Sequence, residues 1–118
     1  MIGAALGGAK VFLCLGATDM RKQINGLSIL AAEHLSLDPF AGSLFVFCNR
    51  RRDIIKILYW DVNGFCLWQK RLEKDRYKWP ASKRQALEIT TRELQWLLSG
   101  LSIKELQAHK ALNYSLLT

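Results

Sequence analysis

Apolar positions recur along the chain with two spacings, one typical of helices and one typical of strands. Residues 19–36 predict an amphipathic helix, with Thr18 as its N-cap and Asp19 in its first turn, where the helix dipole favours a carboxylate. The helical stripe consists of Met20, Ile24, Leu27, Ala31 and Leu35. A second helix is predicted after residues 90–93, which fit a capping box and precede a leucine stripe.

Short apolar runs predict the strands of a sheet. They occupy residues 10–15, 43–48, 54–60, 65–72 and 86–89. The order is strand, helix, a run of strands and helix. This order is typical of an α+β domain in which an antiparallel β-meander packs with an N-terminal amphipathic helix and a second, C-terminal helix. We therefore expect a single domain over residues 1–118, with its core at about 10–101 and a C-terminal extension, helical or frayed, at 102–118.

The pair Asn63-Gly64 lies between two apolar runs and is a strong hairpin signal. A turn centred on this pair places Lys56 opposite Arg71 on one face of the sheet, and like charges directly opposite each other cost about 0.2–1 kcal/mol. A bound phosphate would relieve this repulsion, and the neighbouring carboxylate of Glu73 would serve as well. The other face of the hairpin is the more apolar one and is predicted to face the core.

The positive charge of the chain is concentrated in one segment. The chain has 17 Lys and Arg against 10 Asp and Glu, a net charge of +7 and a pI near 9.6. Residues 50–84 contain eleven basic and four acidic residues, and therefore the whole excess, together with three of the four tryptophans. Cations interleaved with aromatic rings are typical of nucleic-acid surfaces, where the cations bind phosphates and the rings stack on bases. Aromatic residues in strands also fill cores, which is the alternative for these rings.

We predict that this segment binds nucleic acid. Three consecutive arginines in a turn cannot all pair internally, and the planar guanidinium suits a phosphate. Trp60 or Trp79 would stack or pack at the contact. A solvated charged loop is the alternative interpretation of the arginine turn. The predicted nucleic-acid-binding residues are Arg50, Arg51, Arg52, Lys56, Trp60, Lys70, Arg71, Lys74, Arg76 and Lys78.

The sequence predicts no catalytic residues, no metal site and no cofactor. The three cysteines are widely spaced, no C-x-x-C pair occurs, and only two histidines are present. A metal-dependent nuclease would need two or three carboxylates that converge on a divalent ion. The acids nearest the basic segment are Asp19, Asp61 and Glu73, and each has a structural explanation as a helix-start residue, a turn residue or a partner of basic neighbours. A nuclease is therefore only the third hypothesis.

Composition and hydropathy favour a globular chain without a membrane partner. Half of the residues are apolar and 23% are charged. The longest uncharged stretch, residues 39–49, is far shorter than the roughly 18 residues that a membrane helix needs. Widely spaced cysteines in odd number argue against a disulfide framework and favour a reducing compartment, so a cytoplasmic location is expected.

An ordered series of motifs runs along most of the chain. It comprises Thr18-Asp19-Met20-Arg21-Lys22, Asn25-Gly26-Leu27, Asp38-Pro39-Phe40 with Gly42, Leu44-Phe45-Val46-Phe47, Arg50-Arg51, Asp53, Lys56, Leu58, Trp60-Asp61, Gly64, Lys70-Arg71-Leu72-Glu73 and Trp79-Pro80. The series resembles the TnpB-type accessory protein encoded by the second reading frame of insertion-sequence-66 class bacterial transposable elements. The resemblance implies action with a larger transposase, which carries the catalytic acidic residues, and with another small accessory protein. The shared pattern includes Asp19, Arg21, Lys22, Asn25, Gly26, Asp61, Glu73 and Trp79 and assigns no catalytic role to them.

Charge and resemblance together predict a non-enzymatic accessory protein of bacterial DNA transposition. It would bind DNA through residues 50–84 and act with a separate transposase. The alternative is a protein-interaction module that docks on the transposase, or self-associates as a homodimer, without touching DNA directly.

Overall fold

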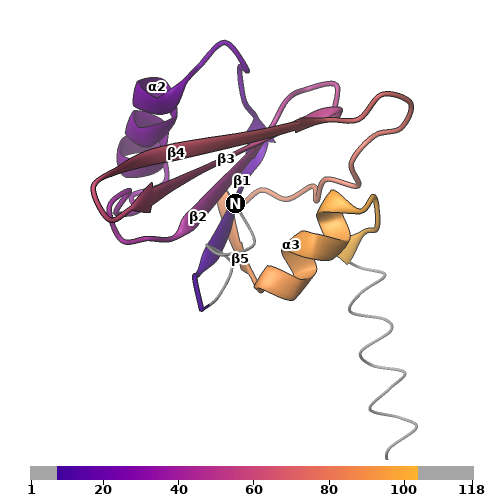
Figure 1. The fold of residues 1–118 in the computed structure, drawn as a ribbon. Helices are drawn as coiled ribbons and strands as arrows, with labels where there is room; N and C mark the ends of the chain where they lie inside the picture. Colours follow the sequence, from indigo (N-terminus) through magenta and orange to yellow (C-terminus); the bar gives the residue numbers. More distant parts are fainter. Residues whose placement is uncertain (1–7, 104–118) are drawn as a thin grey trace, which may run out of the picture.

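The structure, a computed structural model, describes residues 8–103, so most of the predicted C-terminal extension lies outside the described residues. Figure 1 shows a sheet with helices packed on it. The strands are β1 (Val11–Ala17), β2 (Leu44–Cys48), β3 (Ile54–Asp61), β4 (Gly64–Arg71) and β5 (Ala86–Ile89). The helices are α2 (Ile24–Ile29), which continues into the π-helical turn η1 (Leu30–His34), and α3 (Thr91–Leu98). None of the described helices is long and apolar enough to cross a bilayer.

The five strands form one mixed sheet in the order β4-β3-β2-β1-β5. Strands β2, β3 and β4 are the expected antiparallel meander, and β5 pairs antiparallel with β1 at the far edge. Strand β1 is instead parallel to β2, because α2 and η1 lie between them as a crossover. The predicted α+β class is confirmed, with this parallel pair added. As a result, the C-terminal ends of β1 and β2 lie at the same end of the sheet.

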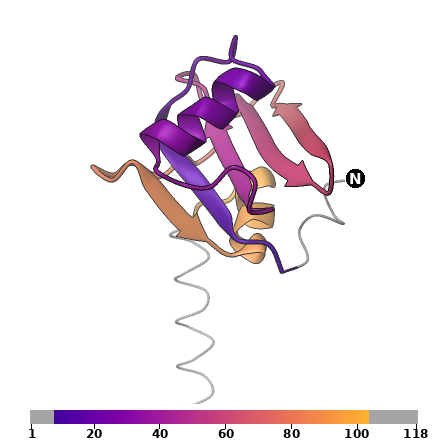
Figure 2. The ribbon, with the colours of Figure 1, turned by 90° about the vertical axis from the view of Figure 1, so that its left-hand side faces the viewer.

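Helices cover both faces of the sheet, as Figure 2 shows with α2 in front of the strands and α3 behind them. On the α3 face, Ile55 and Ile57 of β3 pack in one core cluster with Leu94 and Leu97. This is the hairpin face predicted to be buried. The opposite face is also covered, since Leu58 packs with residues of α2 and η1 in a second cluster. The double cover explains why β2 is apolar throughout its length.

The chain enters its first helix later than the sequence predicts. Helix α2 begins at Ile24, and Gln23 occupies the N-cap position without a side-chain hydrogen bond. Thr18 is not the cap, because its N–H donates to the carbonyl of Cys48 and so continues the β1–β2 contact beyond the strand. Asp19 pairs with Arg21 instead of capping a helix turn. By contrast, the predicted capping box at α3 is confirmed.

The β3–β4 turn lies one residue earlier than predicted. Its central residues are Val62 and Asn63, and Asp61 pairs with Gly64. All cross-strand pairs therefore shift, and Lys56 faces Gln69 rather than Arg71. The predicted like-charge pair does not exist, so the inference of a phosphate between those two residues falls with it. The observed register places the aromatic rings of Trp60 and Phe65 opposite each other, with centroids 5.0 Å apart, which favours this pairing over the predicted one.

Candidate nucleic-acid interface

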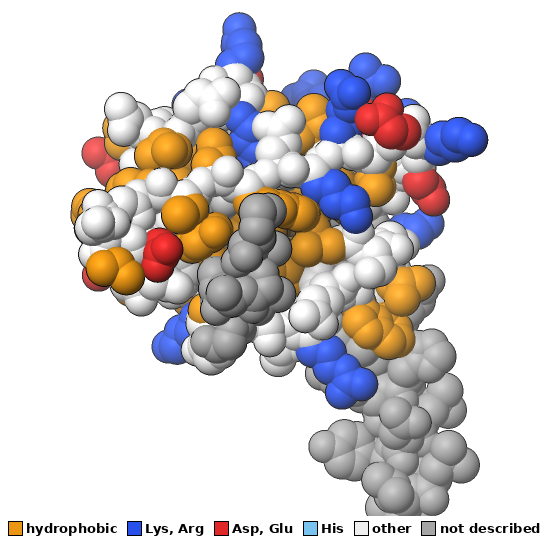
Figure 3. Space-filling model, viewed as in Figure 1, with side chains coloured by type: hydrophobic (Ala, Val, Ile, Leu, Met, Phe, Trp, Pro, Cys, Tyr) orange, Lys and Arg blue, Asp and Glu red, His pale blue; other side chains and the backbone are white. Residues whose placement is uncertain are grey.

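Three segments that are distant in sequence meet at the end of the sheet where β1, β2 and β4 terminate. They are residues 18–22, 49–53 and 71–80. The backbone N–H of Leu72 donates to the carbonyl of Asp53 over 2.8 Å, and that of Tyr77 donates to the carbonyl of Arg52 over 2.7 Å. We call this region the basic end. In Figure 3, Lys and Arg side chains crowd there at the upper right, with a few acidic side chains among them.

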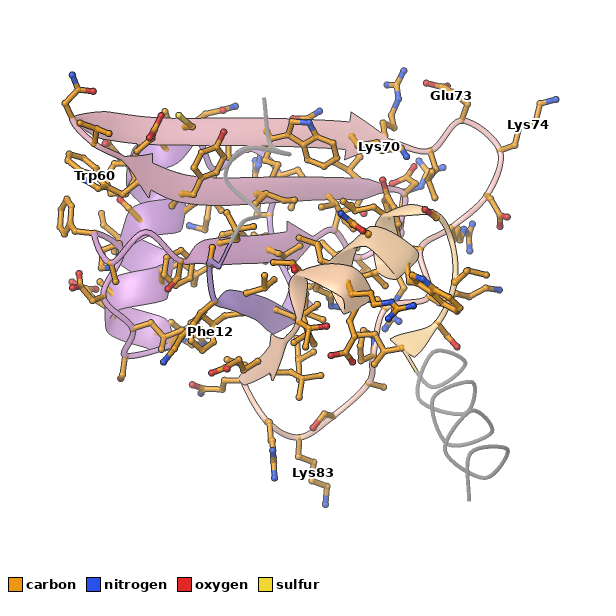
Figure 4. All side chains as sticks on the ribbon, turned by 60° about the horizontal axis from the view of Figure 1, so that its bottom comes forward. Phe12, Trp60, Lys70, Glu73, Lys74 and Lys83 are labelled. Atoms are coloured by element: carbon orange, nitrogen blue, oxygen red, sulfur yellow. The ribbon has the colours of Figure 1, made fainter. Side chains whose placement is uncertain are left out.

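The exposed cations of the basic end come from all three segments and from Lys70, which directly precedes the third segment. They are Arg21, Lys22, Arg50, Arg51, Lys70, Arg71, Lys74, Arg76 and Lys78. Among residues 8–103, only Arg21 and Arg71 form ion pairs, with Asp19 and Glu73 respectively. Figure 4 shows Lys70, Glu73 and Lys74 together at this end, while Lys83 projects elsewhere from the loop before β5. Most of the basic residues of the segment 50–84 are therefore brought together, and Lys83 of that segment is separate from them.

Asn49 organises the arginine turn. Its side-chain Oδ1 accepts hydrogen bonds from the N–H groups of Asp53 and Ile54, each over 3.0 Å, and its Nδ2 donates to Asp53 Oδ1. The hydrogen bond from Asn49 is the main cause that lowers the pKa of Asp53. Because Asn49 holds this carboxylate, Arg50 and Arg51 extend from the turn with no ion pair to any described residue.

Arg52 holds the basic end together rather than extending from it. It adopts a left-handed backbone conformation with φ of 62°, and its side chain is half-buried. Its Nη1 donates to the carbonyl of Trp79 over 2.7 Å, while its own carbonyl accepts from Tyr77. Arg52 therefore ties the segment after β4 to the arginine turn and positions the exposed cations on both.

Lys56 is inside the protein, with an exposed fraction of only 2%. Its Nζ donates to the carbonyls of Met20 and Lys22, over 2.8 and 2.9 Å. These bonds fasten the loop that carries Arg21 and Lys22 to the sheet. A phosphate would have to displace both bonds to reach the ammonium group, so the structure places this predicted contact residue in a supporting position.

The cations of β4 and of the segment after it differ in the contacts that they make within the protein. Lys70 Nζ donates over 3.2 Å to the carbonyl of Leu98 at the C-terminal end of α3, where the helix dipole favours a cation. Arg71 pairs with Glu73 over 3.3 Å, but both side chains are mostly exposed. Lys74, Arg76 and Lys78 are exposed and have no ion pair with a described residue. These three are therefore the most accessible to an anion.

Arg21 and Lys22 belong to the basic end although the charged segment 50–84 does not include them. Arg21 is held in a fork by Asp19, with its Nη2 at 2.7 Å and its Nε at 3.1 Å from the carboxylate. The hydrogen bond from the Arg21 side chain lowers the pKa of Asp19 to about 2. Their placement follows from the parallel pairing of β1 with β2. The periodicity of the sequence does not reveal this pairing.

The two tryptophans proposed for stacking are not at this surface. Trp79 is only 6% exposed and packs in the core cluster of the α3 face. Trp60 is half-buried and lies at the opposite end of the sheet from Lys70 and Lys74 (Figure 4). A groove of about 660 Å³ does run beside the basic end, lined by Arg76, Lys78 and Trp79 among others. The exposed side chains of the basic end are charged rather than aromatic, since Tyr77 and Trp79 beside it are buried.

The acids considered for metal-dependent catalysis are dispersed. Asp19 and Glu73 pair with arginines of the basic end, whereas Asp61 lies at the tip of the β3–β4 hairpin. Within residues 8–103, no group of three or more His, Cys, Asp or Glu is placed to hold a metal ion. The three cysteines form no disulfide bond, and burial raises the pKa of the Cys48 thiol to about 12.

Comparison with known proteins matches these residues to one family. The family model described as IS66 Orf2-like protein matches residues 9–108 of this chain. The chain belongs to this family. It is 38% identical over 92 residues to uncharacterized protein y4hO of Sinorhizobium fredii, covering 78% of this chain and 80% of that protein. It is 35% identical over 101 residues to y4jC of the same organism, an uncharacterized protein, with 86% of each chain covered. No solved structure is significantly similar.

Family membership identifies the chain as an accessory protein of IS66 transposition, and such proteins associate in general with an IS66 transposase. The resemblance seen in the sequence is therefore confirmed. The family motifs fall on both ends of the sheet, since Asp19, Arg21 and Glu73 lie at the basic end and Trp60 and Asp61 at the other.

Proposed function

We propose that this accessory protein binds DNA through the basic end while it acts with a separate transposase. The observation that carries the proposal is the convergence of exposed cations from three segments onto one end of the sheet. Ten basic residues lie in or beside these segments against four acidic ones, Asp19, Asp53, Glu73 and Asp75. Such a surface suits a polyanion, because each neutralised phosphate releases condensed counterions.

The contacts fall into two groups by their engagement within the protein. The proposed phosphate contacts are the exposed cations that make no ion pair among the described residues, namely Lys22, Arg50, Arg51, Lys74, Arg76 and Lys78. Arg52 and Lys56 support them, since both donate to backbone carbonyls. Within residues 8–103, the exposed cations of the basic end lie in loops or in β4 and not on a helix. The proposal is therefore contact with the DNA backbone, without a sequence code assigned to it.

The test is a titration of duplex DNA from the ends of the transposable element at several salt concentrations. Replacing Arg50 and Arg51 together by alanine is expected to weaken binding and to reduce the slope of log affinity against log salt by about two, one for each lost phosphate contact. The matched control replaces Lys83 and Arg84, two exposed cations of the loop before β5, by alanine. It changes the net charge equally and is expected to leave the slope nearly unchanged. No binding by the wild-type protein at low salt would overturn the proposal.

The same cations could instead dock on an acidic face of the transposase. The Arg50→Ala, Arg51→Ala double variant separates the two possibilities when pull-down of the transposase is measured beside DNA binding. Retained pull-down with lost DNA binding supports the proposal. Lost pull-down with retained DNA binding favours the docking alternative.

A further inference from the structure

The end of the sheet opposite the basic end carries a cluster of aromatic rings. Phe40 comes from the loop before β2, Trp60 is the last residue but one of β3, and Phe65 is the second residue of β4. The ring centroids are 5.1 Å apart for Phe40 and Trp60, 5.3 Å for Phe40 and Phe65, and 5.0 Å for Trp60 and Phe65. Val62 is at the tip of the hairpin that carries Trp60 and Phe65. We call Phe40, Trp60, Val62 and Phe65 the aromatic end.

Two side chains of the aromatic end are open to solvent. Phe40 is 58% exposed and Val62 is 89% exposed, while Trp60 and Phe65 are half-buried. The Phe40 ring belongs to neither of the core clusters on the two faces of the sheet. A contiguous exposed apolar cluster on a small protein is typical of an interaction site. Rings that are held edge to face on one another form a rigid anchor that loses little entropy on binding.

The charge at this end decides what covers it. Asp38 and Asp61 are exposed next to the aromatic residues, and Asp38 Oδ1 accepts a hydrogen bond from the N–H of Phe40. Acidic side chains beside the rings oppose the approach of DNA. They also oppose a symmetric pair of two copies of this chain, in which the same carboxylates would face each other. A partner with Lys or Arg next to apolar side chains fits both the rings and their acidic rim.

We propose that the aromatic end is the docking surface for an apolar, basic segment of another protein of the transposable element. The inference rests on the proposed role beside a transposase, but not on DNA binding by the basic end. Figure 4 places Trp60 and the pair Lys70 and Lys74 at opposite ends of the sheet. The two surfaces can therefore be occupied together, so that the protein bridges DNA and the partner.

The test measures binding of the full chain to two immobilised probes, the transposase and the other small accessory protein of the same element. Phe40→Ala is expected to weaken binding to one of them by at least about tenfold, the effect of an aromatic hot spot. Ile29→Ala is the matched control, because Ile29 is a large apolar residue of α2 with a similar exposed fraction of 54%. The control is expected to bind as the wild type does.

Charge reversal provides a second variant that does not touch the packing of the rings. Asp61→Lys is expected to weaken binding to the same probe and to make the remaining affinity less sensitive to salt. Asp75→Lys is its control, with the same change in net charge at the basic end, and it is expected to leave probe binding intact and to strengthen DNA binding. Both variants change exposed side chains, and their folding is checked by thermal unfolding.

Three outcomes would overturn the inference. One is the absence of binding to both probes by the wild-type chain, and another is equal binding by wild type, Phe40→Ala and Asp61→Lys. The third is a wild-type dimer in light scattering that Phe40→Ala converts to a monomer, since a second copy would then be the occupant. DNA binding is measured on the same samples. If the wild-type protein does not bind DNA, the proposed function of the basic end is refuted, while the docking result is unaffected.

Discussion

The two ends of the sheet are built from the same strands but present opposite chemistry. At the basic end, loops from three segments carry exposed cations, and buried groups such as Lys56 and Trp79 hold these loops in place. At the aromatic end, a tight hairpin and the loop before β2 carry rings packed edge to face, with carboxylates beside them. One small sheet therefore separates a cationic surface from an apolar surface by about its own length.

Replacement of a tryptophan at each end tests this division most strongly. Trp79→Ala is expected to lower the free energy of unfolding by about 3–5 kcal/mol, because the ring is buried in the core cluster of the α3 face. Trp60→Ala is expected to cost only about 1–2 kcal/mol, mainly from its contacts with Phe40 and Phe65. Urea unfolding followed by circular dichroism measures both. Equal losses would show that the aromatic end is a second core and not a surface.

Lys56 tests whether the basic end depends on internal support. Lys56→Met keeps the apolar stem but removes both hydrogen bonds to the carbonyls of Met20 and Lys22. The free energy of unfolding is expected to fall by about 2–3 kcal/mol. The salt slope of DNA binding is expected to stay as in the wild type, because Lys56 reaches no phosphate. Lys22→Met, which removes an exposed cation, is expected to show the reverse pattern, and a lower salt slope for Lys56→Met would contradict this division of roles.

The ion pair of Asp19 and Arg21 is expected to have the smallest effect. An NMR titration should give Asp19 a pKa of about 2, below the ordinary value of 3.8, and Arg21→Gln should return it towards that value. A lowered pKa in the folded state stabilises the protein at pH values above the ordinary pKa. The contribution is lost as the pH falls from about 4 to about 2. An unshifted Asp19 in the wild type would show that Arg21 is free to bind DNA.

The sequence predicted local features of the fold well and long-range features poorly. The capping box of α3 was predictable because Thr90 and Glu93 are three residues apart. The two faces of the β3–β4 hairpin were assigned correctly, since side chains alternate along strands. The start of α2 was wrong, because the contact of Thr18 with Cys48 joins residues 30 positions apart. The hairpin register was also wrong, because the contact of Trp60 with Phe65 outweighed the turn preference of Asn63-Gly64.

The candidate site was predictable in composition but not in arrangement. The sequence identified Arg50, Arg51 and the cations after β4, and the structure places them together. It did not separate Lys56 from the exposed cations. The alternation of side chains assigns Lys56 to one face of the sheet but does not show that α2 and η1 cover that face. It also grouped Trp60 with the cations, because they are near each other in the sequence. The eight residues of β3 carry Trp60 to the end of the sheet opposite the arginine turn.

By itself, the sequence determined the sign and amount of charge, the alternation of the strand faces and the family. Tertiary structure alone decided which cations share a surface. The parallel pairing of β1 with β2 brings Arg21 and Lys22 beside the arginine turn, and the hairpin carries the aromatic residues away from it. The physical reason is that local spacing specifies a side chain's face within one element. Its neighbours across the sheet depend on hydrogen bonds and core contacts between residues far apart in the chain.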